Sequence, residues 1–344
     1  MRRSCKALWA ALAVGLSFTG AARADDVADF YRGKTIRMVI GSAAGAGYDL
    51  TGRLLANHMG RHIPGNPSFV VENMPGASSL IMTNYLYNSA PRDGAVIGMP
   101  ASGIMLEPRL NVLSREGGNA RFDVNRFGWL GTPVQDPNVL WVYDTSPVRA
   151  FADLKTMPII VGSTAAGADN YTLPQIVNEL FGARMKIVSG YKGQSDIFIA
   201  AERGEVHGNA TGLPNLTIAK SDWMRDRKVR IIMQFGTERQ KTLRDVPTAA
   251  ELATGEEREM LAFYALKFNM ARPLATPPDV PADRLVALQA AFDATMQDPQ
   301  FLDEAKRQGF DVDPLSGKEI ARYMQMIASA SQPMVDRLKK IIAP

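Results

Sequence analysis

The chain has 344 residues, 46% of them apolar, and a formal net charge of +4 at neutral pH. This length and apolar content allow a substantial core and favour two domains over one. The positive charge belongs to the first 24 residues, and without them Lys plus Arg falls from 39 to 35, equal to the 35 Asp plus Glu. A neutral remainder offers no basic surface for nucleic acid, so we expect no such partner.

The first residues have the pattern of an export signal. Met1–Lys6 is basic, Ala7–Thr19 is largely apolar, and Ala22–Ala24 forms a small-x-small cleavage site. The apolar run is too short for a comfortable transmembrane helix, and no later segment reaches about 18 uninterrupted apolar residues. We predict a Sec-type signal peptide that is cleaved after Ala24. The only cysteine, Cys5, would leave with it, which excludes disulfides, a cysteine nucleophile and a thiolate metal site.

Strand and helix patterns alternate along the first part of the mature chain. Short apolar runs bounded by turn residues predict strands, and apolar residues at helical spacing predict helices. The order is strand Thr35–Ile40, helix Leu50–Ile63, strand Phe69–Val71, helix Ser78–Tyr87 and strand Val96–Met99. Such alternation implies a mostly parallel sheet that is covered on both faces.

A second alternating part follows a loop at Ser114–Asn125. Extended apolar segments at Trp129–Leu130 and Leu140–Tyr143 mark the expected crossing into a second lobe. The elements after it are strand Ile159–Val161, helix Tyr171–Leu180, strand Lys186–Val188, helix Ser195–Glu202, an extended segment from Val206 to Gly208, and strand Val229–Met233, the expected return crossing. A further strand is predicted at Tyr264–Met270, before helices over Pro281–Met296, Pro299–Gln308 and Ser316–Ile342.

Two α/β lobes joined by two crossings are therefore expected. We assign residues 1–24 to the signal peptide, 25–137 and 234–344 to the first lobe, and 138–233 to the second. Such lobes form a cleft between domains, which is a common site for small ligands. In open α/β sheets, ligands lie beyond the carboxyl ends of the strands.

Two similar turns of small residues stand at such strand ends. Gly41–Asp49 follows the first strand, and Gly162–Asn170 echoes it in the second part of the chain. Backbone N–H groups and the helix dipole favour an anion where a helix starts. The glycine spacing matches neither a dinucleotide site nor a phosphate loop, whereas a carboxylate would fit. The alternative is that these glycines and alanines only let helix and strand pack closely.

Several side chains near these turns have two open interpretations. Asp49 could cap the following helix or bind a ligand. Tyr48 and Tyr171 could present a hydroxyl and an apolar ring to an organic acid, or could be buried in the core. Tyr191 should lie at the cleft edge, where Lys192 could attract an anion or only be solvated.

No catalytic or metal-binding motif is recognisable. His58 and His62 are four residues apart, but no Glu follows His58 and no third ligand is evident. The chain has no G-x-S-x-G elbow and no prominent carboxylate pair. We expect no metal, no cofactor and no enzymatic activity. The alternative from another class is a periplasmic enzyme that uses a small-residue turn as an oxyanion hole.

An ordered set of segments resembles the substrate-binding proteins of tripartite tricarboxylate transporters, also called the Bug family. The segments are Asp29–Arg37, the turn ending at Asp49, Val70–Ala77, Asp93-Gly94, Tyr191–Gly193, Arg203–Val206, Asp245–Thr248 and the helical C-terminus. They cover essentially the whole mature chain, and the ordered set is far more specific than any one segment.

The resemblance implies a periplasmic α/β protein with a two-lobed, periplasmic-binding-protein-like fold (type II, Venus flytrap) and two interdomain crossovers. It implies that the lobes close on a small organic carboxylate, which is delivered to membrane permease subunits, and we expect a monomer. The residues it nominates for ligand binding are Ser42, Ala43, Ala44, Gly47, Tyr48, Asp49, Ser102, Gly103, Ser163, Thr164, Ala165, Gly167, Asn170, Tyr191 and Lys192.

The chain also departs from this family's pattern. The family turn usually has prolines and three consecutive glycines before Thr-Asp, whereas this chain has Ala43-Ala44-Gly45-Ala46-Gly47-Tyr48-Asp49. A histidine that is usual in the helix after the second turn is absent. These substitutions face the ligand, so they leave the identity of the acid open. A signalling component that docks on a membrane sensor is the alternative to a transport receptor.

Overall fold

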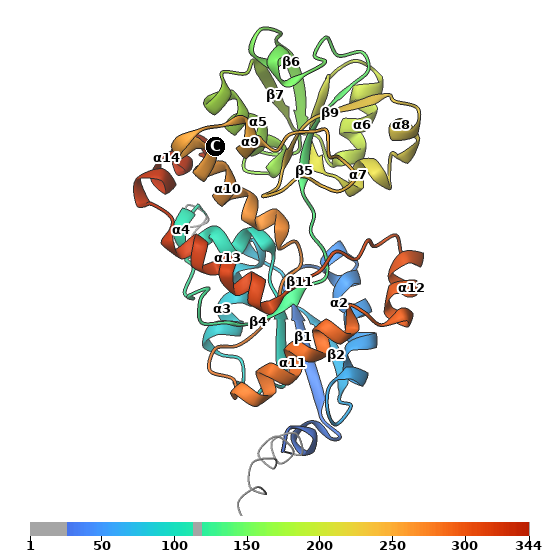
Figure 1. Cartoon of the computed structure of the whole chain (residues 1–344), viewed down its shortest axis with the longest axis vertical. Helices are drawn as coiled ribbons and strands as arrows, with labels where there is room; N and C mark the ends of the chain where they lie inside the picture. Colours follow the sequence, from blue (N-terminus) through green and yellow to red (C-terminus); the bar gives the residue numbers. More distant parts are fainter. Residues whose placement is uncertain (1–25, 113–118, 344) are drawn as a thin grey trace, which may run out of the picture.

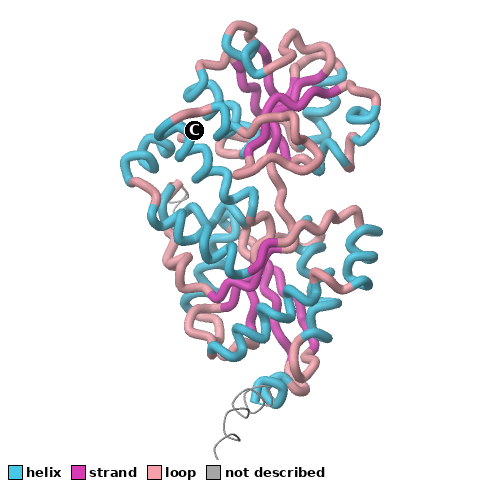
Figure 2. Tube along the Cα trace, viewed as in Figure 1, coloured by secondary structure: helices cyan, strands magenta, loops and turns pink. Residues whose placement is uncertain are grey.

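The computed structural model describes residues 26–112 and 119–343. The predicted signal peptide with Cys5, and residues 114–118 of the predicted loop, lie outside the described residues. Within the described ranges, no helix combines the length and apolar character needed to cross a membrane. Figure 1 shows two α/β lobes stacked along the long axis of the molecule, and Figure 2 shows a separate group of strands in each.

The first lobe is built on a mixed six-stranded sheet with the order β11-β4-β10-β3-β1-β2. Its strands are β1 (Thr35–Ile40), β2 (Ser68–Asn73), β3 (Val96–Met99), β4 (Gly128–Thr132), β10 (Leu274–Thr276) and β11 (Leu315–Ser316). Strands β1, β2 and β3 are parallel, as the alternating pattern predicts. Strands β10 and β11 pair antiparallel with β4, so the C-terminal part of the chain completes this sheet.

Helices cover this sheet and place the first turn. They are α2 (Gly47–Met59), α3 (Leu80–Asn88), α4 (Glu107–Leu110), α11 (Ala282–Thr295), α12 (Pro299–Arg307) and α13 (Gly317–Ser329), with short 3-10 turns η1 (Gly60–His62), η2 (Ala77–Ser79) and η3 (Ser102–Leu106). Apolar side chains of α2, such as Leu55 and Met59, are fully buried. Because α2 starts at the end of β1, this packing fixes the direction of its N-terminus.

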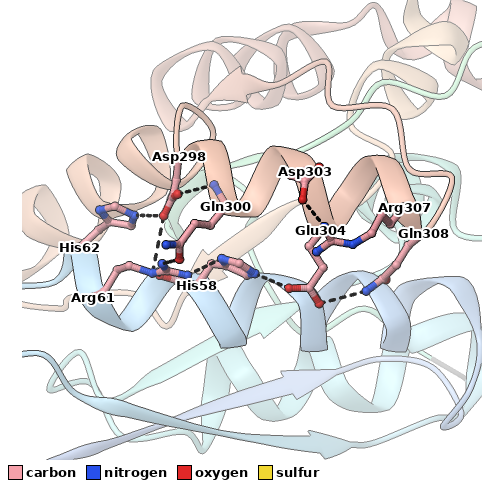
Figure 3. A network of polar contacts seen from close by, with 9 residues as sticks. All are labelled: His58, Arg61, His62, Asp298, Gln300, Asp303, Glu304, Arg307 and Gln308. Carbon is pink, nitrogen blue, oxygen red and sulfur yellow. Dashed lines mark hydrogen bonds and ion pairs between the residues drawn. The ribbon is translucent and has the colours of Figure 1, made fainter.

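Two histidines of the α2 region bind helix α12 rather than each other. His58 Nε2 lies 2.7 Å from Glu304 Oε2, and His62 Nε2 lies 2.9 Å from Asp298 Oδ2 (Figure 3). Arg61 lies between them in the same network and contacts His58. These contacts join segments more than 200 residues apart in sequence and hold α12 against α2.

The second lobe has a five-stranded sheet with the order β7-β6-β8-β5-β9. Its strands are β5 (Asn138–Tyr143), β6 (Ile159–Ser163), β7 (Met185–Ser189), β8 (Gly208–Gly212) and β9 (Val229–Phe235), and its helices are α5 (Asp169–Phe181), α6 (Gln194–Glu202), α7 (Pro214–Thr217) and α8 (Ser221–Arg225), with the 3-10 turn η5 (Phe151–Lys155). Strands β7, β6 and β8 are parallel, and β5 is antiparallel to β8 and β9. Trp141, Phe198 and Trp223 form an aromatic cluster in its core.

The chain passes between the lobes at the segment that follows β4, Pro133–Pro137, and returns after β9. On the return path it forms α9 (Ala249–Leu252) and α10 (Gly255–Asn269) before β10. The last helix, α14 (Gln332–Ile342), packs against α5 of the second lobe. The exact residue boundaries of the two lobes stay a prediction.

Two predicted elements differ from the structure. Tyr264–Met270 is not a strand, because Tyr264–Asn269 forms the last part of helix α10. This part of α10 is buried on every side, so its apolar residues show no helical periodicity and resemble a strand in sequence. The single helix predicted over Ser316–Ile342 is interrupted, since α13 ends at Ser329 and Pro333 lies in the first turn of α14.

Candidate functional site

The turns after β1 and β6 have similar backbone conformations just before the helices that follow them. Gly45 and Gly167 adopt φ values of +79° and +86°, which an L-amino acid side chain disfavours. A Cβ at either position would meet nothing within 4 Å. Backbone conformation, rather than close packing, is therefore the reason for these two glycines. Packing does account for Gly41, where a Cβ would lie 1.7 Å from Ser79 Oγ.

Both turns lead into helices whose N-caps are alanines. Ala46 before α2 and Ala168 before α5 have extended backbones, with φ, ψ of −74°, 162° and −68°, 153°, and neither helix has a side-chain cap. Alanine at this position costs about 1 kcal/mol relative to Ser, Thr, Asp or Asn. Each lobe therefore presents the start of a 13-residue helix without a side-chain cap, which is a favourable place for an anion.

Asp49 is used by the protein to hold the first turn. Its carboxylate accepts hydrogen bonds from the Gly45 N–H (2.8 Å) and from Asn73 Nδ2 (2.9 Å), and it forms an ion pair with Arg53. The Arg53 hydrogen bond is the largest cause that lowers the pKa of Asp49 to about 2. These contacts favour the structural interpretation of this residue.

Asn170 has the equivalent task in the second turn. Its Oδ1 accepts hydrogen bonds from Ser163 Oγ (2.9 Å), from the Thr164 N–H (3.1 Å) and from Thr164 Oγ1 (3.2 Å). The side chains of Ser163, Thr164 and Asn170 therefore bind one another. What this turn offers a ligand is backbone N–H groups rather than these side chains.

A pocket of about 120 Å³ lies between the two lobes, next to both helix N-termini. The residues that line it are Tyr48, Ser102, Asp136, Asn138, Asp169, Lys267, Phe268, Ala271 and Arg272. Two of them, Tyr48 and Ser102, are among the predicted binding residues. The Tyr48 hydroxyl donates to the Ala271 carbonyl oxygen (2.5 Å) and accepts from the Ser102 N–H (3.1 Å). Tyr48 thus connects the first turn to the segment after α10.

The other predicted binding residues lie outside the lining of this pocket. They are Ser42, Ala43, Ala44, Gly47, Asp49, Gly103, Ser163, Thr164, Ala165, Gly167, Asn170, Tyr191 and Lys192. Gly47 lies beside it, because a Cβ there would be 3.5 Å from Arg272 Nη2. Lys192 is exposed, and its backbone N–H donates to Asp196. Tyr191 is half-buried against the core of the second lobe.

The sequence reasoning missed the charged residues of the pocket. Lys267 on α10 is buried, and its Nζ donates to Asp169 Oδ1 (2.5 Å) and to the Tyr264 hydroxyl (2.9 Å). Burial opposes the charge of this lysine, but Asp169 and Tyr264 outweigh that effect and raise the pKa of Lys267. This ion pair joins α10 to the N-terminus of α5.

In the part of the chain that the structure describes, Arg272 and Asp136 each have one buried polar atom without a hydrogen-bond partner. The Arg272 guanidinium lies over the rings of Tyr48 and Phe310, with its carbon 5.6 and 5.7 Å from the ring centres, and its buried Nε has no hydrogen-bond partner. Oδ1 of Asp136 is also buried without one. Burial is the main cause that raises the pKa of Asp136, with Arg272 acting against it.

The sequence gives only a weak signal for these residues. Asp136 lies between Pro133 and Pro137 in the predicted crossing, but its position alone does not indicate that it lines a pocket. Arg272 was hidden because the preceding segment had been predicted as a strand. The last part of α10 is buried on every side and shows no polar face, so the sequence does not indicate the direction of Lys267.

The structure has the features of a two-lobed solute-binding protein. These are two α/β lobes, two chain crossings and a charged pocket next to the N-termini of α2 and α5. The chain belongs to the tripartite tricarboxylate transporter receptor family (TctC), whose family model matches residues 52–342. Proteins of this family are periplasmic solute receptors of tripartite tricarboxylate transporters rather than enzymes. The family resemblance and the two-lobed fold predicted from the sequence are both confirmed.

Individual relatives are distant in sequence but cover nearly the whole chain. The UPF0065 protein in the gbd 5' region of Cupriavidus necator is 24% identical over 319 residues, which are 90% of this chain and 89% of that protein. A TctC solute-binding protein from Polaromonas, solved without ligand, has a TM-score of 0.70 at 18% identity and covers 91% of this chain and 99% of its own. MatC from Rhodopseudomonas palustris, solved with bound malate, has a TM-score of 0.55 at 17% identity and covers 90% and 99%. An R. palustris protein solved with adipate has a TM-score of 0.56 at 20% identity and covers 90% and 96%.

Proposed function

We propose that this protein is a periplasmic receptor that captures a small organic carboxylate between its lobes and delivers it to the permease of a tripartite tricarboxylate-type transporter. The observation that carries the proposal is the pair of helix N-termini without side-chain caps, one from each lobe, beside a pocket that contains Arg272. In this proposal the protein is exported by the predicted signal peptide and acts as a monomer without metal or cofactor.

The ligand carboxylate is held mainly by backbone N–H groups. The two turns, from Ser42 to Asp49 and from Ser163 to Asn170, supply the N–H groups that the protein does not already use, since those of Gly45 and Thr164 donate to Asp49 and Asn170. Arg272 supplies a positive charge. Hydrogen bonds between N–H groups and a carboxylate are roughly twice as strong as neutral ones. The pocket volume of about 120 Å³ is small beside the roughly 300–1,000 Å³ of sites for drug-sized ligands, which supports a compact acid.

The same arrangement couples binding to lobe closure. A ligand that contacts the α2 turn in one lobe and the α5 turn in the other binds the closed arrangement better than an open one. The difference between these two affinities sets how far the ligand shifts the equilibrium. A ligand held by one lobe alone would produce no such shift.

The proposal is tested by calorimetry and thermal shift with the mature protein, residues 25–344, against mono-, di- and tricarboxylic acids, aromatic acids, sugars and cationic amino acids. We expect at least one carboxylate to bind and to raise the melting temperature. Arg272→Gln should weaken that binding, whereas the control Arg307→Gln on α12 should not, since Arg307 pairs with Asp303 away from the pocket. Binding of sugars or cationic amino acids, with no carboxylate bound, would refute the proposal.

Delivery to a permease needs a separate experiment in cells. Deletion of the gene for this protein should abolish uptake of the acid found by calorimetry, and expression of the exported protein should restore it. Unchanged uptake in the deletion strain would refute the transport role while leaving carboxylate binding intact.

A further inference from the structure

We propose that the ligand carries a hydrogen-bond donor in addition to its carboxylate, so that it is a hydroxy or amino acid rather than an unsubstituted acid, and that Asp136 accepts this donor. The inference rests on the proposed function, because it concerns the ligand of the same pocket. It adds a chemical requirement that the helix N-termini alone do not impose.

The first step is the position of Asp136. Its backbone N–H donates to the Phe268 carbonyl oxygen (2.9 Å), which ties the crossing segment to the end of α10. Its side chain lines the pocket. On the other side, Oδ1 lies against Gly212, where a Cβ would approach it to 2.8 Å. Backbone therefore encloses Oδ1, while the residue as a whole lines the pocket.

The second step is the lack of a protein donor. Among the described residues, Oδ1 of the Asp136 carboxylate is fully buried and has no hydrogen-bond partner. A buried acceptor without a donor is costly, and a charged one more so. The pKa of Asp136 is raised, mainly by burial, while Arg272 lowers it and Asp169 raises it further. A donor on the ligand would remove this cost.

The third step is the distribution of charge in the pocket. Lys267 and Asp169 neutralise each other through their 2.5 Å contact. Arg272 and Asp136 remain, with opposite charges that act on each other electrostatically, while Arg272 Nε and Asp136 Oδ1 have no hydrogen-bond partner. Asn138 also lines the pocket but is neutral. The pocket therefore contains one cationic and one anionic side chain, and it is complementary to a ligand that carries both a carboxylate and a hydroxyl or ammonium group.

An unsubstituted acid does not fit this distribution as well. A monocarboxylate would satisfy Arg272 but leave Asp136 without a donor. An unsubstituted dicarboxylate would also bring a second negative charge towards Asp136. A site built to hydrogen-bond a ligand donor rejects the analogue that lacks it, because the buried protein group is then left unpaired.

The experiment compares acids that share one carbon skeleton. Calorimetry with the mature protein uses propionate, lactate and alanine as one series, and succinate, malate and aspartate as another. Within the series that binds, we expect the hydroxy or the amino acid to bind at least about tenfold more tightly than the unsubstituted acid. The arm that binds best identifies the donor as a hydroxyl or an ammonium group.

Variants of Asp136 test whether this residue recognises the hydrogen-bond donor of the ligand. Asp136→Leu should reduce the preference to about threefold or less without lowering the melting temperature, because an apolar side chain of similar size replaces an unpaired buried carboxylate. Asp136→Asn is a second variant that keeps the shape of the side chain, and it should reduce any preference for an ammonium group. The matched control is Asp303→Asn, on the exposed face of α12, which should preserve every affinity.

Two results would overturn the inference. One is an unsubstituted acid that binds as tightly as its hydroxy and amino analogues. The other is a preference for the donor that survives in Asp136→Leu. In both cases a carboxylate still binds, so the proposed function stands. If no acid of any series or panel binds, the proposed function itself fails, and this inference falls with it.

Discussion

Helix caps at the two turns would compete with the ligand for the same backbone groups. We expect Ala46→Ser and Ala168→Ser to stabilise the free protein and to weaken carboxylate binding. Both alanines already have the extended backbone of an N-cap, so a serine can accept a hydrogen bond from the N–H of the second or third helical residue. A bound carboxylate would have to displace that serine oxygen.

The size of both effects follows from the energy of a cap. A serine in place of alanine contributes about 1 kcal/mol, which corresponds to a rise in melting temperature of roughly 2–4 °C for domains of 150–250 residues. The ligand loses about the same free energy when it displaces the cap, which is roughly a fivefold loss of affinity per turn. The turns lie in different lobes, so the double variant should lose about 25-fold.

Calorimetry and thermal unfolding of the same preparations measure both quantities. The control is Ser316→Ala, which removes the cap of α13 where Ser316 Oγ accepts the Glu319 N–H. It should lower stability by about 1 kcal/mol and leave affinity unchanged. If the serine variants gain stability and still bind with full affinity, the helix N-termini do not hold the ligand. If only one of them weakens binding, the ligand uses only that lobe.

Three further perturbations test the fold. His58→Leu removes the 2.7 Å contact with Glu304. Urea unfolding should show that the free energy of unfolding falls by about 1–3 kcal/mol, while the affinity for the ligand stays unchanged. An unchanged unfolding midpoint would contradict the role of this contact. Gly208→Ala would place a Cβ 2.0 Å from the Trp141 carbonyl oxygen. We expect this variant to be less stable by at least about 1–3 kcal/mol, measured as a lower melting temperature. A variant of normal stability would refute this packing. The pKa of Asp49 is lowered from 3.8 to about 2, so its contribution to stability, of the order of 1–2 kcal/mol, is present above about pH 4 and lost as the pH falls towards 2. The difference in stability between the wild type and Asp49→Asn should therefore shrink over this range. A difference that widens would contradict this prediction.

Local patterns in the sequence were sufficient for most of the fold. The strand-turn-helix units after Ile40 and after Val161 depend on short apolar runs, small turn residues and helical spacing, all of which are local properties. Strands β10 and β11 were not predicted, because three- and two-residue segments that pair only with distant partners carry almost no periodicity. The last part of helix α10, Tyr264–Asn269, resembles a strand in sequence because it is buried on all sides, which removes the amphipathic pattern.

In the candidate site, too, only the features that depend on local sequence could be predicted. The backbone of the two turns could be predicted, because glycine and alanine at a strand-to-helix junction have a direct conformational meaning. The charged residues of the pocket could not, because Asp136, Lys267 and Arg272 are brought together only by the two crossings and by α10. Nothing in the spacing of residues separated by 131 positions indicates that Asp136 and Lys267 line one pocket.

Tyr48 illustrates how the sequence and the structure together define the role of a residue. The sequence marks it as a departure from the family turn and suggests that it faces the ligand. In the structure it lines the pocket, but its hydroxyl already bonds the Ala271 carbonyl and the Ser102 N–H, while its ring supports the Arg272 guanidinium. A tyrosine here therefore supports the Arg272 cation in the pocket, which Asp136 also lines. In the proposed receptor, the backbone of the turns selects a carboxylate. The side chains of Arg272 and Asp136 then select the other polar groups that the acid carries.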